Sequence, residues 1–245
     1  MSPDGSFLLF ISSRPQNPLD KPIDGFFNGK AQPGQGGNLW RADWNGSRWS
    51  EPVRLPEIVN RSKGIYAPSV VKDGSAYFME AGGEKNTFRL YRSQFRNGQY
   101  ERPEPVPFSS GEVTDVDPAV APDESFAVFG SSRPPALVDL FIVFRQNGTW
   151  GTPLHMGTAV NSPGSDAEPR LDPDQRTLYF SSDRVLPINF PRDRDEAERD
   201  LKRIEEWDNG NYNIWQISLD SWLKAKHQEE KVASQKGKAA APCCQ

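Results

Sequence analysis

Short apolar runs of strand length recur along the chain, and four of them follow a turn that contains an aspartate. The runs FLLFIS, AYFME, FAVFGS and TLYFSS begin three residues after Asp4, Asp73, Asp123 and Asp174. Runs of apolar, β-branched and aromatic residues of this length are typical of strands. The four aspartates are 69, 50 and 51 residues apart, and a period near 50 residues predicts stacked copies of one structural unit.

A second apolar run follows each of the first runs, after a loop of variable length. The second runs are NLWRAD from Asn38, FRLYRS from Phe88, DLFIVF from Asp139 and NIWQIS from Asn213. Three units continue with Asn-Gly, the strongest short signal for a type I′ hairpin, at Asn45, Asn97 and Asn147.

An aromatic residue with a proline three positions later then begins a further strand in the same three units, at Trp49, Tyr100 and Trp150. Proline cannot donate a hydrogen bond to a sheet, so this strand is expected at the edge. The unit is therefore predicted to be a four-stranded antiparallel sheet, the blade of an all-β propeller.

The order of these motifs resembles the TolB-like family of β-propellers, a WD-repeat-like family with Pro-Asp repeats. Residues 169–184, PRLDPDQRTLYFSSDR, are close to its consensus, and the pattern covers residues 2 to about 220. The second unit departs from it with Lys72 and Met79-Glu80, and the last two units have Glu124 and Gln175 where the family has glycine. The resemblance implies five or six blades in the full chain, an export signal before them and a role outside the cytoplasm.

The predicted domain organisation is a propeller over residues 1–223 and a disordered tail over residues 224–245. The units cover about 1–60, 61–112, 113–163 and 164–223 and contain three, four, four and three predicted strands. Such a ring either closes with four blades or lacks an N-terminal piece. We favour the second alternative, because Met1 falls where a residue inside a blade would stand.

Composition excludes several function classes. The longest apolar runs have five residues, far short of a membrane helix, and the sequence given has no signal peptide. The net charge of −4 offers a nucleic acid no overall attraction. Cys243 and Cys244 lie at the end of the tail, and the only histidines are His155 and His227. A thiol nucleophile, a Ser-His-Asp triad and a histidine zinc site are therefore not expected, and neither is a cofactor other than calcium.

Candidate binding residues gather on one predicted face, because the alternating strand directions bring the loops between second and third strands together there. Two long insertions lie on this face, residues 15–37 (the first insertion) and residues 185–211 (the second insertion), and long loops on a rigid scaffold often bind ligands. The candidates at the channel mouth are Tyr66, Asp115, Asp117, Asp166, Glu168, Arg14, Arg133 and Arg184. The candidates in the insertions are Phe26, Phe27 and Trp207.

The second insertion contains a predicted helix over residues 192–207, with a narrow apolar stripe through Ala197, Leu201, Ile204 and Trp207. This helix is interpreted either as a lid or docking element or as a solvated helix on the rim of the propeller.

Two readings of the acidic residues stay open. They could form a ring that holds a cation such as calcium, a sugar or a basic peptide. Alternatively, each acid pairs with a neighbouring arginine or caps a turn. The leading hypothesis is a non-catalytic binding or scaffold propeller for a protein, a peptide or a cell-envelope glycan.

That propeller is expected to be monomeric, and periplasmic or secreted if the full chain carries an export signal. The alternative is a hydrolase or lyase, with calcium as an assisting ion, whose acids Asp115, Asp117, Asp166 and Glu168 would converge in one pocket. A third hypothesis is that this part of the chain supports a further domain.

Overall fold

The protein is built from antiparallel β-sheets. The computed structural model describes residues 1–27, 30–82, 87–134, 137–185, 190–206, 210–226 and 228, and the side chains of residues 26, 27 and 206 are outside this description. Four main sheets, called units 1 to 4, follow one another along the chain. Within the described ranges, no helix has the length and apolarity of a membrane span.

Units 1 and 2 occupy the first half of the chain. Unit 1 contains β1 (Phe7–Ser12), β4 (Asn38–Asp43) and β5 (Val53–Arg54), with the hairpin of β2 (Gly25–Phe27) and β3 (Lys30–Gln32) in the first insertion. Unit 2 contains β6 (Ile65–Val70), β7 (Ala76–Ala81), β8 (Phe88–Ser93) and β11 (Glu104–Pro105), with the hairpin of β9 (Phe95–Arg96) and β10 (Gln99–Tyr100).

Units 3 and 4 occupy the second half. Unit 3 contains β12 (Asp115–Val120), β13 (Phe126–Ser131), β14 (Asp139–Gln146), β15 (Thr149–Trp150) and β16 (Leu154–His155). Unit 4 contains β17 (Asp166–Leu171), β18 (Thr177–Ser182) and β19 (Asn213–Ser218), with helix α1 (Arg194–Glu206) between the last two strands. The apolar runs of the repeats form the predicted strands, and the fold is all-β. The last strand of units 1 to 3 begins only after the predicted proline and has two residues, as β5, β11 and β16.

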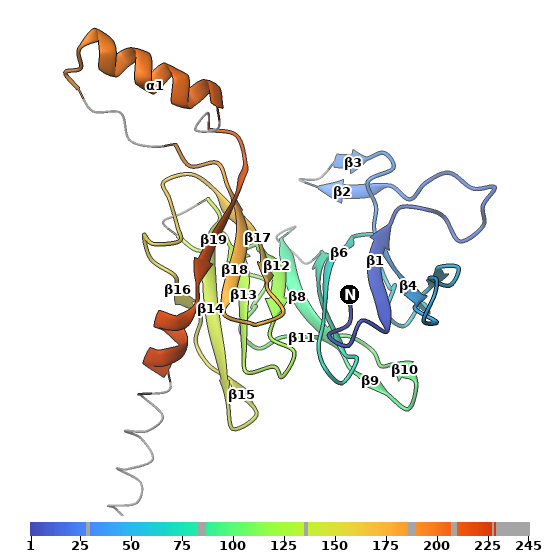
Figure 1. Ribbon diagram of the computed structural model, residues 1–245. Coiled ribbons are helices and arrows are strands. Elements are labelled where there is room, and N and C mark those ends of the chain that lie inside the picture. Colours follow the sequence, from blue (N-terminus) through green and yellow to red (C-terminus); the bar gives the residue numbers. More distant parts are fainter. Residues whose placement is uncertain are drawn as a thin grey trace, which may run out of the picture.

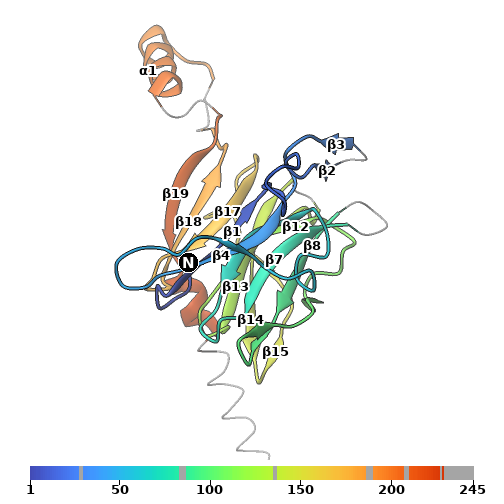
Figure 2. The same ribbon diagram turned by 90° about the vertical axis from the view of Figure 1, so that its right-hand side faces the viewer.

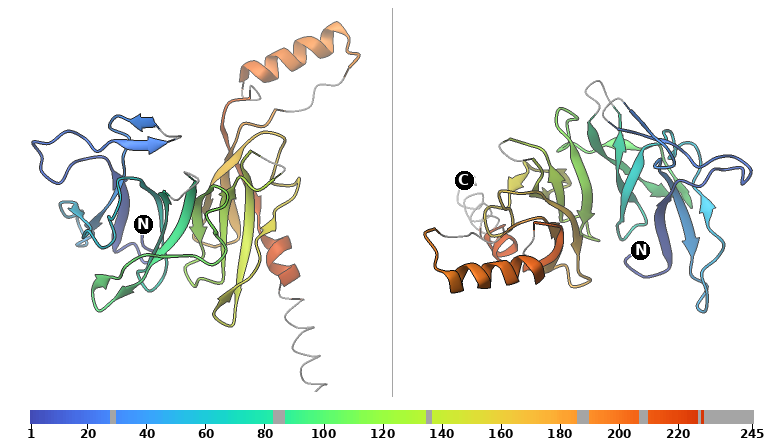
Figure 3. Two further views of the ribbon diagram at one scale, coloured as in Figure 1. Left: turned by 180° about the vertical axis from the view of Figure 1, so that it is seen from behind. Right: turned by 90° about the horizontal axis from the view of Figure 1, so that it is seen from above.

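The units stand around an arc, as the view from above shows (Figure 3, right). The innermost strands β6, β12 and β17 lie side by side, and β1 lies beside β6. Each pair of neighbouring units encloses a hydrophobic core, centred on Phe78 between units 1 and 2, on Phe129 between units 2 and 3, and on Phe180 between units 3 and 4. Among the described residues, no strand pairing joins unit 4 to unit 1.

The turn after each repeat aspartate has one residue with left-handed backbone. Gly5 and Gly74 have φ of 73° and 85°, and Glu124 and Gln175 have φ of 57° and 58° at the same place. Glycine adopts this conformation readily, whereas other residues adopt it at a cost. The sequence reading that these two residues replace the turn glycine is confirmed.

Two of the three Asn-Gly turns are type I′ hairpins. Asn97 and Asn147 have positive φ, as have the glycines that follow them. The prediction is wrong at Asn45, where only Gly46 has positive φ. Instead, the Asn45 side chain accepts hydrogen bonds from the backbone N–H groups of Ser47 at 3.1 Å and Arg48 at 3.0 Å. An asparagine side chain that closes the turn itself removes the need for left-handed backbone at that residue.

Unit 2 has a shorter turn than the other units, and this changes which side chains face which neighbour. The closing hydrogen bond joins Val71 to Ser75 in unit 2, but Ala121 to Phe126 in unit 3. Counting from the aspartate would therefore place Tyr77 in the core with unit 1. The structure instead places Phe78 there and Tyr77 in the core with unit 3, because a slip of one residue turns a strand over.

The side chain of Glu124, at the left-handed position of the turn, joins units 2 and 3 through hydrogen bonds and an ion pair. Its carboxylate accepts hydrogen bonds from Tyr77 Oη at 2.6 Å and from Arg92 Nε at 2.7 Å, and it pairs with Arg145 Nη1 at 2.6 Å. Burial alone would raise the pKa of Glu124, but the hydrogen bonds from Tyr77 and Arg92 hold this pKa below its ordinary value. The same burial and the bond to Glu124 raise the pKa of Tyr77.

Both insertions extend from the same end of the molecule, as the sequence predicts (Figure 1). Helix α1 lies beyond the ends of β18 and β19, clear of the sheets in two perpendicular views (Figures 1 and 2). Its first turn is closed by Asp193 and Glu196, which exchange hydrogen bonds between side chain and backbone N–H at 2.8 and 2.9 Å.

The chain after β19 is helical over residues 220–226, and Trp222 and Leu223 pack against the core of units 3 and 4. Residues 224–226 are therefore helical, whereas the sequence analysis predicts a disordered tail from residue 224. The rest of that tail, with His227, Cys243 and Cys244, lies outside the described residues.

Replacing Glu124 by glycine is expected to destabilise the protein by about 2 kcal/mol near neutral pH, because the hydrogen bonds lost are to charged groups. Stability contributed by an acid with a lowered pKa is lost only as the pH falls through that pKa, so the difference from wild type should shrink at about pH 3. Urea unfolding at both pH values measures this.

The matched control is Gln175→Gly at the same turn position, where no ion pair is present among the described residues. Relief of left-handed strain should leave this variant as stable as wild type or more stable by up to about 1 kcal/mol. Equal stabilities of the two glycine variants would contradict a role for Glu124 between the units.

Candidate functional site

In each of the four units an arginine lies over an aromatic ring, and the rings belong to β4, β8, β14 and β19. The distances from the guanidinium carbon to the ring centroid are 4.9 Å for Arg14 and Trp40, 4.4 Å for Arg61 and Tyr91, 5.4 Å for Arg133 and Phe141, and 4.6 Å for Arg184 and Trp215. Such cation–π contacts stabilise more strongly when they are removed from water. The arginine and its aromatic ring therefore occupy an equivalent position in each unit, beside the inner strands.

Asp115 and Asp166 are held by these arginines inside the protein. Both carboxylates are 0% exposed, and Arg133 Nη1 lies 2.7 Å from Asp115 while Arg184 Nη2 lies 3.0 Å from Asp166. Ser131 Oγ also donates to Asp115 at 2.6 Å. Burial raises the pKa of Asp115 even though Ser131 and Arg133 favour its ionised form.

The same arginines reach across to the preceding unit. Arg133 Nη2 donates to the backbone carbonyl of Phe108 at 2.8 Å, and Arg184 donates to that of Val160. Each arginine thus joins the inner strand of its own unit to the last loop of the unit before. We call this arrangement of arginine, carboxylate and aromatic ring the seam clamp.

Unit 2 has a seam clamp that sequence reasoning missed. Arg61 pairs with the buried Glu80 at 2.5 Å and lies over Tyr91. This arginine precedes the innermost strand, whereas Arg133 and Arg184 follow the second strand, so no fixed spacing relates them. The one sequence feature that could have indicated this clamp is Glu80, which occupies the position of a serine in the other units.

Arg14 differs from the other three arginines. It lies over Trp40, but no ion pair of its guanidinium is recorded among the described residues, and unit 1 has no strand on the inner side of β1. The sequence placed Arg14 with Arg133 and Arg184, and the structure separates it from them by its lack of a carboxylate.

Asp117 and Glu168 occupy bulges in the inner strands. Both have left-handed backbone, with φ of 51° and 52°, and each precedes a proline where the strand register shifts. Asp117 is half-buried, and burial, with Glu168 nearby, raises its pKa against the opposing effect of Arg170. Glu168 is exposed and accepts a hydrogen bond from Ser181 Oγ at 2.7 Å.

The predicted acidic residues therefore have different surroundings. Asp115 and Asp166 are paired in two separate seams, whereas Asp117 and Glu168 are neighbours on adjacent inner strands. A cavity of about 460 Å³ does lie along the inner strands, between Pro68, Pro118 and Arg170, but neither Asp117 nor Glu168 lines it. No cluster of three or more His, Cys, Asp or Glu suited to a metal ion occurs in the described part of the chain.

Tyr66 holds the first insertion against unit 2. Its hydroxyl donates to the backbone carbonyl of Gln35 at 2.8 Å, and its ring packs on Phe88 at 5.9 Å. A side chain at Gly37 would meet the backbone carbonyl of Ile65 and the Tyr66 ring, so glycine is required for this close approach. The phenol thus positions the loop rather than pointing into a cavity.

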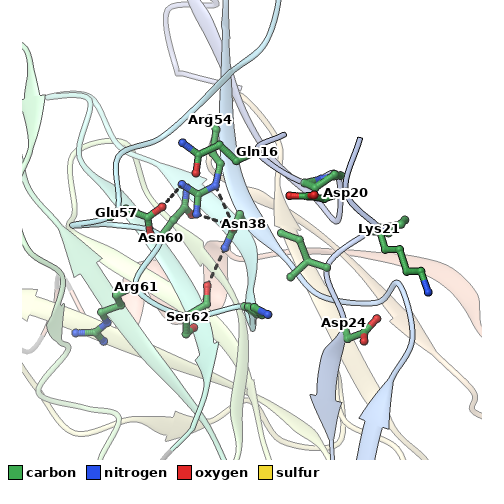
Figure 4. Close-up of a pocket in the computed structure, with 14 residues that line it drawn as sticks. Gln16, Asp20, Lys21, Asp24, Asn38, Arg54, Glu57, Asn60, Arg61 and Ser62 are labelled. Atoms are coloured by element: carbon green, nitrogen blue, oxygen red, sulfur yellow. Dashed lines mark hydrogen bonds and ion pairs between the residues drawn. The ribbon is translucent and has the colours of Figure 1, made fainter. Parts of the chain in front are cut away.

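A pocket of about 500 Å³ opens beneath the first insertion (Figure 4). One wall comes from the insertion, with Gln16, Asp20, Lys21 and Asp24, and the facing wall comes from unit 1 and the loop before β6. The remaining lining residues are Pro15, Pro22, Ile23, Asn38, Arg54, Glu57, Asn60, Arg61, Ser62 and Lys63.

The facing wall of this pocket is a fixed hydrogen-bond network. Arg54 donates to Asn38 Oδ1 at 2.9 and 3.0 Å and pairs with Glu57 at 2.7 Å. Asn38 Nδ2 donates to the carbonyl of Ser62 at 2.7 Å (Figure 4). Asn60 is buried and bonds both the N–H and the C=O of Leu39. Because these groups satisfy one another, this wall is preorganised.

Charged groups without an ion pair within the described ranges line the opposite side and the floor. They are Asp20, Lys21, Asp24 and Lys63, and Asp24 Oδ1 also accepts a hydrogen bond from the backbone N–H of Gly34 at 2.9 Å. The pocket can therefore offer both a carboxylate and two ammonium groups to a ligand. Trp207, a predicted binding residue, lies outside the described residues. The same holds for the side chains of the predicted residues Phe26 and Phe27.

Comparison with known proteins gives fold-level likenesses. No family model matches the sequence, and no curated protein matches it. TolB from Acinetobacter baumannii aligns with a TM-score of 0.47 and 14% identity over 89% of this chain and 40% of that chain. A putative TolB from Agrobacterium tumefaciens aligns with a TM-score of 0.46 and 20% identity over 89% of this chain and 75% of that chain. The chain is similar to TolB structures.

A puromycin-hydrolysing peptidase of Mycobacterium tuberculosis aligns at a TM-score of 0.41 and 14% identity, over 73% of this chain and 26% of that one. This chain thus spans 40% of the length of the Acinetobacter TolB and less of the peptidase. The repeat motifs predict a TolB-like family, and two of the similar structures are TolB structures, with a likeness at the level of the fold.

Replacing Arg133 by methionine is expected to destabilise the protein by about 3–5 kcal/mol, because it leaves a fully buried carboxylate without its partner. Asp115→Asn should cost less, since the amide still accepts from Ser131 and Arg133. In Arg133→Met the raised pKa of Asp115 makes its ionised form the destabilising one, so stability should recover as the pH falls through that pKa.

Urea unfolding of both variants between neutral and mildly acidic pH measures these differences. Arg184→Met, the same change in unit 4, should repeat the effect through Asp166. Equal, pH-independent costs for Arg133→Met and Asp115→Asn would contradict the pairing as the reason.

Proposed function

We propose that this protein is a non-catalytic binding propeller that recognises a charged peptide segment of a partner protein in the pocket beneath the first insertion. The observation that carries the proposal is the pocket itself. It combines a preorganised polar wall, built on Arg54 and Asn38, with charges of both signs at Asp20, Lys21 and Lys63 that have no ion pair within the described part of the chain. Polar groups that are fixed before binding reduce the entropy lost on association.

The lining favours a peptide over a glycan. No aromatic ring is among the described residues that line the pocket, whereas lysine, arginine, aspartate and glutamate all are. Charges of both signs match a polypeptide with charged side chains, and complementary charges contribute mainly specificity and association rate. Calcium has no part in this proposal, because the acids Asp20 and Asp24 share their wall of the pocket with Lys21, and Lys63 lies on the facing wall.

The arrangement of the acids supports binding rather than hydrolysis. A catalytic pair needs two carboxylates with separated pKa values beside one cavity. Asp115 and Asp166 are instead buried in separate seams, and each has its own arginine. Because the repeat motifs resemble those of TolB-like propellers, we propose that the protein acts outside the cytoplasm. The repeat scaffold could equally carry a further domain of a longer chain.

Selection from a displayed library of random dodecapeptides tests the proposal. Selected peptides, labelled and measured by fluorescence anisotropy, should bind wild-type protein with an affinity that falls as salt is added, because charge pairs at an open pocket are screened. The double variant Lys21→Glu, Lys63→Glu should bind the same peptides about tenfold more weakly or worse, since each lost exposed charge pair contributes up to about 1 kcal/mol.

The matched control is Lys72→Glu in the turn of unit 2, at the opposite end of the sheets, which should leave affinity unchanged. Failure to select any peptide, or equal affinity of the selected peptides for wild type and the double variant, would overturn the proposed function.

A further inference from the structure

The inner edge of β1 is an open sheet edge whose chemistry can be compared with the closed edges of units 3 and 4. The turn hydrogen bonds align Phe7 with Phe126 and therefore Ser12 with Ser131. In unit 3 the strand β12 fills this edge, with Val116 opposite Gly130, Ala119 opposite Val128, and Asp115 opposite Ser131. In unit 1 no described strand stands at this place.

The backbone of β1 directs hydrogen-bonding groups to this edge. Leu39 uses its N–H and C=O on Asn60 and Leu55, away from β1, so its partner Ile11 must direct its own groups to the inner side. By alternation Leu9 does the same. The next residue in this series, Phe7, already bonds Ser2 on that side through both its N–H and its C=O. For Leu9 and Ile11, no hydrogen bond is recorded within the described ranges.

Ser12 and Arg14 form the rest of a seam clamp at the same edge. The Arg14 N–H donates to Ser12 Oγ at 3.2 Å, as the Arg184 N–H donates to Ser182 Oγ at 3.2 Å in unit 4. Arg184 then pairs with Asp166 of the inner strand, and Arg133 pairs with Asp115. Arg14 has the serine and the aromatic ring of the clamp, and an aspartate from an inner strand would complete it.

Two apolar side chains of β1 lie on its face turned away from unit 2. Leu8 and Phe10 are half-buried and, unlike Phe7 and Leu9, are outside the core shared with unit 2. The indole Nε1 of Trp40 is buried and has no hydrogen-bond partner among the described residues. A buried N–H group without an acceptor is costly, so an added strand or its loop could supply one.

We propose that the open edge of β1 binds an antiparallel β-strand from another polypeptide segment, with an aspartate opposite Ser12 that pairs with Arg14. The occupant has the chemistry of β12 and β17, namely an extended segment with an aspartate at its start. Its backbone bonds Leu9 and Ile11, and its carboxylate bonds Arg14. Addition of a strand to an exposed edge is an established mode of peptide recognition, in which main-chain bonds give affinity and side chains give specificity.

This surface is distinct from the pocket beneath the first insertion, and the proposal does not depend on the proposed function. The probe is a labelled synthetic peptide with the sequence of residues 112–122, EVTDVDPAVAP, which is β12 with its flanks. We expect saturable binding to the 245-residue protein by fluorescence anisotropy, and a rise in melting temperature with peptide concentration.

Two peptide variants of equal charge separate the clamp from general attraction. The peptide with Asp115→Asn should bind about tenfold more weakly, because it loses a charge-assisted bond. The peptide with Asp117→Asn should bind within about twofold of the original, since that residue has no place opposite Ser12.

Protein variants complete the test. Arg14→Gln should weaken the original peptide about tenfold and remove the discrimination between the two variant peptides. The charge-matched control Arg48→Gln, in the exposed turn of the same unit, should change neither.

Three results would overturn the proposal: no saturable binding, equal binding of the two variant peptides to wild type, or discrimination that survives Arg14→Gln. A concentration-dependent dimer that Arg14→Gln abolishes and the peptide does not compete with would also overturn it, because the occupant would then be a second copy of the chain.

Discussion

The seam clamp is the interaction on which the arrangement of the units depends. Flat antiparallel sheets with apolar faces could slide against one another, because hydrophobic burial is not directional. Arg133 and Arg184 fix the position by bonding a buried aspartate in their own unit and a backbone carbonyl in the unit before. A charged group taken out of water has few acceptable geometries, so each clamp selects one register between neighbouring sheets.

The inner strands serve this constraint by accepting strained backbone. Asp117 and Glu168 are left-handed residues before prolines, and so is Ala67 at the same place in unit 2. These bulges shift the register within each inner strand after its second residue. The first residue of β12 and of β17 can then face the serine of the second strand, while the later residues still pair along the sheet. In units 3 and 4, the cost of this strained backbone is offset by the ion pairs of the buried Asp115 and Asp166 that it positions.

The sequence predicts the repeated fold because every unit uses the same turn and strand chemistry, and it predicts the shared face of both insertions from strand direction alone. It fails where one unit reaches the same structure by another route. The short turn of unit 2 reverses the faces of β7, Asn45 closes its turn with a side chain, and Arg61 enters its clamp from a different loop. The pocket beneath the first insertion could not be predicted, since its walls join Lys21 to Lys63 through the fold and not through any spacing.

The two ends of the arc differ in a way that follows from the same chemistry. In unit 4 the side chains that alternate with the core residues Leu178 and Phe180 are Thr177, Tyr179 and Ser181. Their aligned positions in unit 3, which face unit 4, hold Phe126, Val128 and Gly130. The polar groups of this face are satisfied locally, as Ser181 bonds Glu168 and Tyr179 bonds Asp172. Exposure of this face of unit 4 to water therefore costs little free energy. Unit 1 differs, because within the described ranges the backbone groups of Leu9 and Ile11 at its edge have no hydrogen bond and Arg14 has no carboxylate partner. The described units therefore form an array whose two ends differ in polarity, and of these two ends the edge of β1 has the chemistry that favours addition of a further strand.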